Sequence, residues 1–161
     1  MEPTLVPGER VLVSRISMQL GGPHVGDIVV FYPPTGAEEG LCGASGQGQG
    51  TSSACDKPNP QEDKTVTFIK RIVAGPGDTI YIKDGHVYRN GKLEADSFAN
   101  PCTGNLEQCT FTTPIKIPPG HWFMMGDNRG NSEDSRFWGP VPTSWIVGIE
   151  FATYWPLNRV F

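Results

Sequence analysis

Two short turn sequences, Asp84-Gly85 and Asn90-Gly91, constrain the fold of this chain more than any other feature. An Asx-Gly pair between two strands favours the two-residue type I′ hairpin, because both central residues of that turn need positive φ. Both pairs lie inside the segment YIKDGHVYRNGKLE. The segment therefore predicts a three-stranded antiparallel meander over residues 81–94.

The other apolar segments also favour strands, because their apolar residues alternate or run continuously over lengths that suit a strand better than a helix. No segment carries apolar residues at convincing helical spacing, and the 20 glycines and 15 prolines supply frequent turns without a period. The sequence therefore predicts a mostly β protein with little helix, a barrel or sandwich of short strands. Besides the meander, the expected strands are 10–16, 27–32, 65–73, 112–117, 122–125 and 146–154.

Length and charge narrow the class of protein. The chain has 161 residues, enough for one domain of ordinary size or a core with one large insertion. Its formal net charge of −4 argues against binding driven by nucleic-acid phosphates, so no nucleic acid partner is expected. No stretch approaches the roughly 18 apolar residues that a membrane span needs, so the printed residues are expected to form a soluble domain.

The four cysteines form two pairs along the chain, Cys42 with Cys55 and Cys102 with Cys109. A zinc site is disfavoured, because no C-x-x-C occurs and the three histidines are scattered, so no metal is expected. Four cysteines allow three disulfide connectivities, and free thiols are a further alternative. We favour two short loops, because each pair brackets turn-forming residues, and disulfides would indicate an oxidising compartment.

Residues 34–64 differ from the rest of the chain. The stretch LCGASGQGQGTSSACDKPNPQED is rich in Gly, Ser, Gln and Pro and poor in apolar residues. Such composition predicts an insertion that forms a long surface loop or a disordered excursion, tethered by its two cysteines. No role can be assigned to it from the sequence.

Lys70 is the first candidate for chemistry. In a strand, Phe68, Lys70 and Ile72 share one face, so the lysine is flanked by two large apolar side chains. If that face is buried, desolvation lowers the pKa of the lysine, and a neutral lysine can act as a general base. The alternative, which the pattern alone favours, is a lysine that reaches solvent beside Arg71.

The second candidate is the polar loop GDNRGNSEDSR over residues 126–136. Asp134 and Arg136 can pair and brace this loop. A calcium loop of the EF-hand type is excluded, because the required glycine position holds Ser132. A hydrogen-bonded turn without chemistry is the alternative.

Taken together, four stretches resemble the bacterial type I signal peptidase family. They are M-E-P-T-L near the start, G-D-I-V-V-F, I-K-R-x-x-x-x-P-G-D, and G-D-N-R-x-N-S-x-D-S-R-x-W-G. The resemblance extends over residues 1–13, 26–31, 68–78 and 126–141, in the family's order. Any one of these motifs is moderately specific, and the set is much more so.

The resemblance implies a signal-peptidase-like antiparallel β barrel or sheet core with a smaller inserted β subdomain. The pair Cys102 and Cys109 resembles a disulfide that some members carry in the smaller subdomain, whereas the insertion is not part of the family core. The expected division is a catalytic core of 1–33, 65–80 and 118–161, the insertion 34–64, and the smaller subdomain 81–117.

The resemblance also implies a serine endopeptidase with a lysine general base. Lys70 matches the family's base, Ser132 matches the serine that orients that lysine, and Asp134 and Arg136 match the pair that braces the loop. The family's nucleophilic serine immediately precedes the residue that matches Met1. We therefore expect the nucleophile, a second serine of the oxyanion hole and a membrane anchor upstream of the printed chain, which by itself would be inactive.

The implied substrates are signal peptides of secreted preproteins, cleaved after small residues at positions −1 and −3. The peptide is expected to add as a β-strand near Phe68 and Ile69. The other implied partner is the membrane surface, with the catalytic domain on the extracytoplasmic side of the bacterial plasma membrane and no cofactor. The −1 pocket is expected to involve Met1, Leu5, Phe68 and Ile69, and the −3 pocket Val11, Val30 and Ile69.

Three alternatives remain open at this stage. One is a repressor-type Ser/Lys autoprotease, which would need neither paired cysteines nor the G-D-N-R motif. The second makes Ser132 the nucleophile, with Lys70 as its base. The third is a non-catalytic extracytoplasmic β domain that binds extended peptides, although binding alone gives no reason for a lysine on an apolar face.

Overall fold

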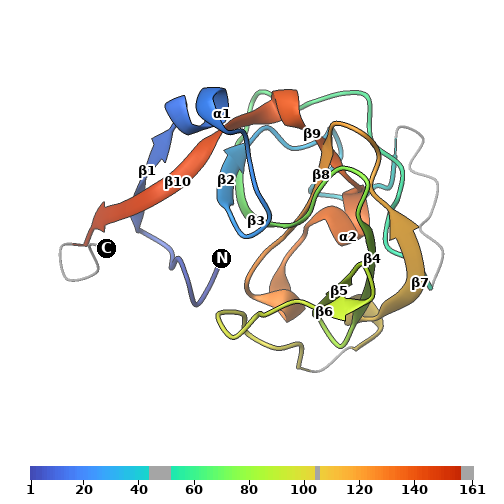
Figure 1. Cartoon of the computed structure of the whole chain (residues 1–161). Coiled ribbons are helices and arrows are strands. Elements are labelled where there is room, and N and C mark those ends of the chain that lie inside the picture. Colours follow the sequence, from blue (N-terminus) through green and yellow to red (C-terminus); the bar gives the residue numbers. More distant parts are fainter. Residues whose placement is uncertain (44–51, 104–105, 157–161) are drawn as a thin grey trace.

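A computed structural model describes residues 1–43, 52–103 and 106–156, which form two antiparallel sheets (Figure 1). This architecture confirms the prediction of a mostly β protein with little helix. The six-stranded sheet, in the order β1-β10-β2-β3-β8-β9, contains β1 (Arg10–Ser14), β2 (Ile28–Phe31), β3 (Phe68–Ala74), β8 (His121–Met125), β9 (Val141–Pro142) and β10 (Ile146–Trp155). The four-stranded sheet, in the order β6-β5-β4-β7, contains β4 (Thr79–Lys83), β5 (His86–Arg89), β6 (Lys92–Leu93) and β7 (Phe111–Lys116).

The predicted meander is present as β4, β5 and β6. Its two turns have positive φ at both central residues, 53° and 83° at Asp84 and Gly85 and 52° and 80° at Asn90 and Gly91. These values are the requirement of the type I′ turn from which the hairpins were predicted. The rings of Tyr81 and Tyr88, paired across β4 and β5, stack 4.6 Å apart and stabilise the first hairpin.

Strands β3 and β8 lie between two hydrophobic clusters. Successive residues of β8 point to opposite sides, so Phe123 and Met125 join one cluster and Met124 joins the other. On β3, Val73 and Ile72 divide in the same way. Because both faces are covered there, the ends of these strands are continuously apolar, at residues 72–74 of β3 and 122–125 of β8. The two strands that lead into the candidate site are therefore fixed from both sides.

Helices are few and short, but the expectation of strand at the end of the 10–16 segment was wrong. Strand β1 ends at Ser14 and helix α1 (Ile16–Leu20) follows, with the Ser17 amide donating to the Ser14 hydroxyl. Helix α2 (Ser135–Trp138) begins at the end of the polar loop, with Asp134 as its N-cap. Single turns of this length have no apolar stripe to detect. The 3₁₀ turns are η1 (Leu106–Cys109), η2 (Arg129–Asn131) and η3 (Thr143–Trp145).

The insertion is closed at its base and packed at several points. The Thr35 amide donates to the Gln61 carbonyl at 3.0 Å, and the Asp63 amide donates to the Pro33 carbonyl at 2.7 Å. Ala37 and Ala54 are buried in the two hydrophobic clusters. Residues 44–51 of the insertion lie outside the described residues.

Both cysteine pairs form the short-loop disulfides that the sequence favoured. Cys42 bonds to Cys55 within the insertion, and Cys102 bonds to Cys109 at the edge of the smaller sheet. Across residues 1–43, 52–103 and 106–156, no helix has the length and apolar content needed to cross a bilayer.

Candidate active site

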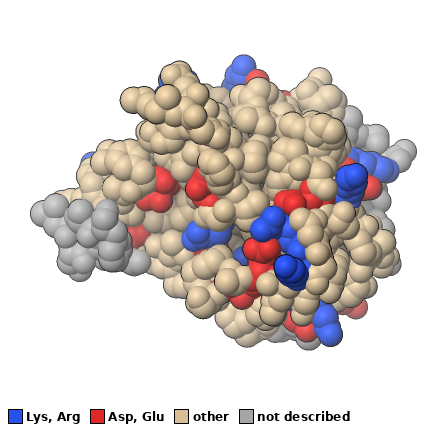
Figure 2. Space-filling model, viewed as in Figure 1, with Lys and Arg blue, Asp and Glu red and all other residues tan. Residues whose placement is uncertain are grey.

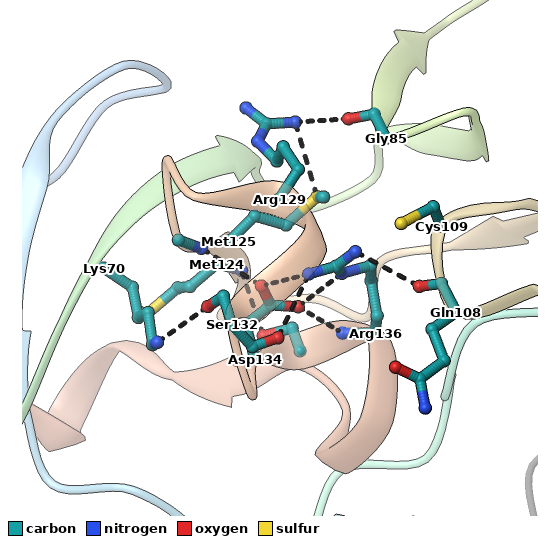
Figure 3. Close-up of polar contacts among 12 residues, drawn as sticks. Lys70, Gly85, Gln108, Cys109, Met124, Met125, Arg129, Ser132, Asp134 and Arg136 are labelled. Carbon is teal, nitrogen blue, oxygen red and sulfur yellow. Dashed lines mark hydrogen bonds and ion pairs between the residues drawn. The ribbon is translucent and has the colours of Figure 1, made fainter. Parts of the chain in front are cut away.

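Lys70 and Ser132, which are 62 residues apart in sequence, meet in the structure. Lys70 lies on β3 and Ser132 follows η2 in the loop after β8, and these two strands pair in the same sheet. The amine of Lys70 donates a hydrogen bond to the Ser132 hydroxyl at 2.8 Å (Figure 3). A basic amine and a hydroxyl at this distance form the geometry of a proton-transfer pair.

The contact depends on Gly126, the first residue after β8. A Cβ placed on Gly126 would lie 2.2 Å from the Ser132 hydroxyl oxygen and 3.5 Å from the Lys70 amine. No real Cβ makes contacts as short as the first, so any side chain at this position would displace Ser132. The absence of a side chain at Gly126 therefore creates the space in which the two groups meet.

Burial changes the proton affinity of Lys70. Desolvation by the surrounding protein lowers the pKa of Lys70 from its ordinary value, and the Arg136 charge lowers it further, while the carboxylates of Asp134 and Glu133 oppose the shift. The amine also lies 5.9 Å from the centre of the Phe68 ring, on the shared strand face noted in the sequence. A lysine with a lowered pKa has a larger neutral fraction near neutral pH, which a general base requires.

An ion pair holds the backbone around Ser132. The Arg136 guanidinium donates to both oxygens of the Asp134 carboxylate, at 2.8 and 2.9 Å, and to the Ser132 carbonyl at 3.1 Å. Asp134 also accepts the Gly126 amide at 3.1 Å. The side chains of Asp134 and Arg136 are 0% and 1% exposed, so this buried network holds the backbone of the loop in place.

The charge of Arg136 keeps Asp134 ionised. Burial by itself would raise the pKa of Asp134, but the charge and hydrogen bonds of Arg136 hold it below the ordinary value. The pair can therefore brace the loop as an anion and a cation at neutral pH. This placement agrees with the bracing expected from the resemblance, although the role stays a prediction.

A second network, which the sequence did not reveal, links the N-terminal segment to the same loop. Arg71 donates to both oxygens of Asp127, at 2.9 and 2.8 Å, and to the Gly26 carbonyl at 2.8 Å. The Thr4 hydroxyl also donates to Asp127. Asp127 therefore joins β3, the loop after β8 and the chain before β1. The only sequence signal was the proximity of Asp127 and Arg71 to the two catalytic candidates.

Arg129 ties the loop to the smaller sheet. It is 2% exposed and donates to the Gly85 carbonyl in the first hairpin turn at 2.8 Å. The turn and the candidate site are therefore connected through one buried side chain.

A cavity of about 510 Å³ lies over the Lys70–Ser132 pair. Its wall is formed by the N-terminal segment, β1, β2, β3 and the loop after β8. All six residues predicted to bind substrate line this cavity together with the pair, whereas the four cysteines do not. The six are Met1, Leu5, Val11, Val30, Phe68 and Ile69.

The nitrogen of Met1 lies within the electrostatic reach of Lys70. Burial lowers the pKa of the Met1 amino group, and the charge of Lys70 lowers it further. Met1 and Lys70 also line the same cavity.

The site has no feature of a metal centre. Within the described residues, no three or more His, Cys, Asp or Glu side chains gather in an arrangement that could hold a metal ion. The chemistry that this arrangement can perform is proton transfer by a lysine amine, beside a cavity that can hold an extended chain.

Comparisons with known proteins identify the family of this chain. The family model described as "Signal peptidase, peptidase S26" matches residues 1–155. The chain therefore belongs to the signal peptidase S26 family.

Several curated relatives are similar along almost the whole chain. The probable signal peptidase I-1 of Synechocystis sp. and the signal peptidase I of Leptolyngbya laminosa are 35% and 34% identical over 99% of this chain, which spans 68% and 66% of their lengths. The thylakoidal processing peptidase 1 of Arabidopsis thaliana is 35% identical, and the chain spans 41% of its length. A crystal structure of a signal peptidase I from Enterococcus faecalis is 21% identical, with a TM-score of 0.46 over 79% of this chain and 95% of that chain.

Proposed function

We propose that this chain carries the catalytic base of a serine endopeptidase that removes signal peptides from preproteins. The observation that carries the proposal is the partly buried amine of Lys70, 2.8 Å from the Ser132 hydroxyl, beside a cavity lined in part by apolar side chains. Lys70 takes a proton from the attacking serine and passes it to the leaving amine. Ser132 orients the amine, as a third group does in other catalytic triads.

The nucleophile in this proposal is a serine directly before Met1, outside the printed sequence. Met1 and Lys70 line the same cavity and interact electrostatically, which supports this position. Without that serine, the chain would bind substrate but not cleave it.

The proposed substrate is an extended peptide with small side chains at positions −1 and −3. Val30 and Ile69 are paired across β2 and β3 and both line the cavity, which suits a shallow apolar pocket. Such pockets select by excluding bulk, because an extra methylene that fits changes the transition-state energy by only about 1–3 kcal/mol. The preference for small residues would therefore depend on how little space these side chains leave.

The same contact fits a second mechanism in which Ser132 is the nucleophile and Lys70 its base. In that mechanism the printed chain would be active without any upstream residue. The network around Ser132 favours the orienting role, because Arg136 holds the Ser132 carbonyl and the Ser132 hydroxyl packs closely against Gly126.

The deciding experiment measures cleavage of a preprotein peptide with alanine at −1 and −3. Three chains are compared. They are the printed chain, a chain extended upstream so that a serine precedes Met1, and the same extended chain with alanine in place of that serine. We expect only the serine-extended chain to cleave, and Lys70→Met to reduce its rate by about 10²–10⁴-fold. Lys64→Met is the matched control, because Lys64 is 69% exposed, is paired with Glu62 and does not line the cavity.

The other outcomes distinguish the alternatives. Cleavage by the printed chain that Ser132→Ala abolishes would establish Ser132 as the nucleophile. Peptide binding without cleavage in any extended chain would favour a non-catalytic binding domain.

The second proposed partner is the membrane surface. Large apolar side chains are exposed on α1 and on the paired strands β1 and β10, and the surface over α1 is mostly uncharged in Figure 2. Exposed apolar residues gathered in one region indicate an interaction surface, and tryptophan suits the membrane boundary. These residues are Leu12, Ile16, Leu20, Phe151, Tyr154 and Trp155.

Cosedimentation with anionic vesicles tests this assignment. Leu20 is 85% and Phe151 62% exposed, and we expect the double change Leu20→Ser/Phe151→Ser to weaken binding. Leu93→Ser is the control, since Leu93 is 57% exposed but lies on β6 of the other sheet. Equal binding by all three proteins would remove the membrane surface from the proposal.

A further inference from the structure

The second half of the insertion is packed against the loop that holds Ser132. The Cys55 amide donates to the main-chain carbonyl of Arg136, in helix α2, at 2.9 Å. Cys55 is 1% exposed, and its neighbour Ala54 lies in the hydrophobic cluster against which Phe137 packs. The insertion therefore reaches the catalytic loop with both main-chain and side-chain contacts.

The turn after α2 leaves no space between these two segments. Gly139 has φ +90°, and a Cβ on it would lie 2.5 Å from the Lys57 carbonyl oxygen and 3.1 Å from the Cys55 sulfur. On the first half of the insertion, a Cβ on Gly40 would lie 3.5 Å from the Glu133 carboxylate. Residues from both halves of the insertion therefore lie close to the loop.

Arg136 connects the insertion to the catalytic pair. Its main-chain carbonyl accepts the Cys55 amide, while its side chain donates to the Ser132 carbonyl and binds Asp134. A displacement of α2 would therefore move the anchor of Ser132, the residue that receives the hydrogen bond of Lys70. The insertion is therefore connected to Lys70 through Arg136 and then Ser132.

The disulfide gives this path its rigidity. Gly, Ser and Gln residues dominate the segment between Cys42 and Cys55, so little apolar surface is available there to hold it by burial. The disulfide joins the two halves of the insertion that contact the loop. By limiting the freedom of the unfolded segment, it favours the packed arrangement of residues 54–57.

We propose that the insertion is a positioning element of the active site, in which the Cys42–Cys55 disulfide holds residues 54–57 on α2 and thereby fixes Ser132 against Lys70. Cys55 is a positioning residue that acts through Arg136 and touches no substrate. The catalytic consequence rests on the proposed function, whereas the placement of Ser132 against Lys70 does not. In a reducing environment the site would lose this support.

Two changes weaken the contact in different ways. Cys42→Ala/Cys55→Ala removes the disulfide, and Gly139→Ala pushes residues 55–57 away from α2. Gly77→Ala is the matched control for the second change, because Gly77 has a similar φ of +84° but a Cβ on it would meet nothing within 4 Å. Alanine strains the positive-φ backbone at both positions, and only Gly139→Ala also acts on the insertion; the disulfide variant carries no such strain.

The experiment has two readouts, taken at a temperature where each variant is folded. The first is the pKa of Lys70, followed by NMR in chains labelled with ¹³C at the lysine Cε. The second is kcat and KM of the serine-extended chain. We expect both contact variants to shift the pKa of Lys70 and to lower kcat at least tenfold with little change in KM, whereas Gly77→Ala keeps both values.

Unchanged Lys70 titration and kcat in both folded contact variants would overturn the proposal. An equal effect of Gly77→Ala would also overturn it, because general destabilisation would then be sufficient. If the extended wild-type chain cleaves nothing, the proposed function fails, but the titration of Lys70 in the printed chain still decides whether the insertion positions Ser132.

Discussion

The amine of Lys70 meets the hydroxyl of Ser132 directly above Gly126, where a Cβ would lie 2.2 Å from the hydroxyl oxygen. Three segments meet at this point: the middle of β3, the first residue after β8 and the end of η2. The position of the proposed base therefore depends on a residue that has no functional group. This dependence can be tested without altering either member of the pair.

Gly126→Ala is expected to separate Lys70 from Ser132. The added methyl group cannot share space with the Ser132 hydroxyl, so that side chain must turn away from the amine. In the serine-extended chain, we expect kcat for the preprotein peptide to fall by about 10²-fold or more, since the base would lose its orienting partner. Steady-state cleavage and circular dichroism together separate this effect from unfolding.

The matched control is Gly130→Ala in the same loop. A Cβ there would find its nearest neighbour at 3.6 Å, which is an ordinary contact. We expect near wild-type cleavage from this variant. A comparable loss of kcat from both substitutions would mean that the loop, rather than the Lys70–Ser132 contact, limits the reaction.

The cleavage rate should depend on the titration of Lys70. A base must be neutral, so kcat/KM rises with pH through the pKa of Lys70, which burial places below its ordinary value of 10.5. The Glu133 carboxylate raises this pKa, so Glu133→Gln should move the rising limb to lower pH. Lys70→Arg should remove activity at every pH, because arginine does not deprotonate in proteins.

The pH profile of the serine-extended chain, measured at two salt concentrations, checks the assignment. Glu133 is exposed, so its effect should weaken at high salt. If kcat/KM of Glu133→Gln rises at the same pH as that of the wild-type chain at low salt, a group other than Lys70 controls the rise.

The buried pair Asp134–Arg136 should dominate the acid stability of the fold. The pKa of Asp134 lies below its ordinary value of 3.8, so the pair contributes stability above that pH and loses it as the pH falls through the lower, folded-state pKa. Asp134→Asn leaves Arg136 buried without its counter-charge, which costs about 3–5 kcal/mol at neutral pH. Urea unfolding at several pH values should show this loss, and a flatter acid limb in the variant.

Asp63→Asn is the comparison for this prediction. The pKa of Asp63 is also lowered, by hydrogen bonds from Thr65, but the carboxylate is exposed to solvent. We expect little change in stability at neutral pH. If both variants lost the same stability, burial of the ion pair would not be the cause.

The sequence revealed the hairpins because the relevant information is local. The turn conformation of Asp84 and Gly85 is favoured by those two residues alone, as is that of Asn90 and Gly91. Helix α1 was missed for the opposite reason. None of its five residues is buried and it has no apolar stripe, so its conformation depends on local contacts such as the hydrogen bond from the Ser17 amide to the Ser14 hydroxyl.

The candidate site also has features that depend on local sequence and features that depend on tertiary contacts. Strand periodicity placed Lys70 between Phe68 and Ile72, but that pattern alone favoured a solvent-facing lysine, and the family resemblance was needed to relate Lys70 to Ser132. The close approach at Gly126 arises only when β3 and β8 pair, so neither motif contains it alone. Packing of the insertion on α2 also depends on tertiary contacts, which composition cannot reveal.

The pocket proposed for position −3 should widen on Val30→Ala. Val30 pairs with Ile69 and both line the cavity, so removing two methyl groups leaves space for a larger peptide side chain. We expect the ratio of kcat/KM for leucine over alanine at −3 to rise by about 10–200-fold, the range of a methylene-sized pocket. Cleavage of paired peptides that differ only at this position measures the ratio.

Val29→Ala is the neighbouring control. Val29 is fully buried in the core beneath β2 and does not line the cavity. This variant should lose stability, typically by about 0.5–3 kcal/mol, and keep the wild-type peptide preference. A changed preference in this variant alone would move the −3 pocket away from Val30.

Thr4→Val should loosen the N-terminal segment without disturbing the base. Valine keeps the shape of threonine but cannot donate to Asp127, whose carboxylate retains two hydrogen bonds from Arg71. Hydrogen bonds to charged groups contribute about 1.5–3 kcal/mol, so kcat/KM of the serine-extended chain should fall by roughly tenfold or more. The pH at which kcat/KM rises should be the same in Thr4→Val as in the wild-type chain.

Hydrogen exchange at the Leu5 amide provides a direct reading of the same change. This amide donates to the Met1 carbonyl in the segment that Thr4 anchors, so its exchange should accelerate in the variant. The control is Thr65→Val, which removes an equivalent threonine–aspartate contact with Asp63 on the surface. Faster exchange of Leu5 with unchanged cleavage would show that the reaction tolerates a mobile N-terminal segment, and Thr4 would then have no positioning role.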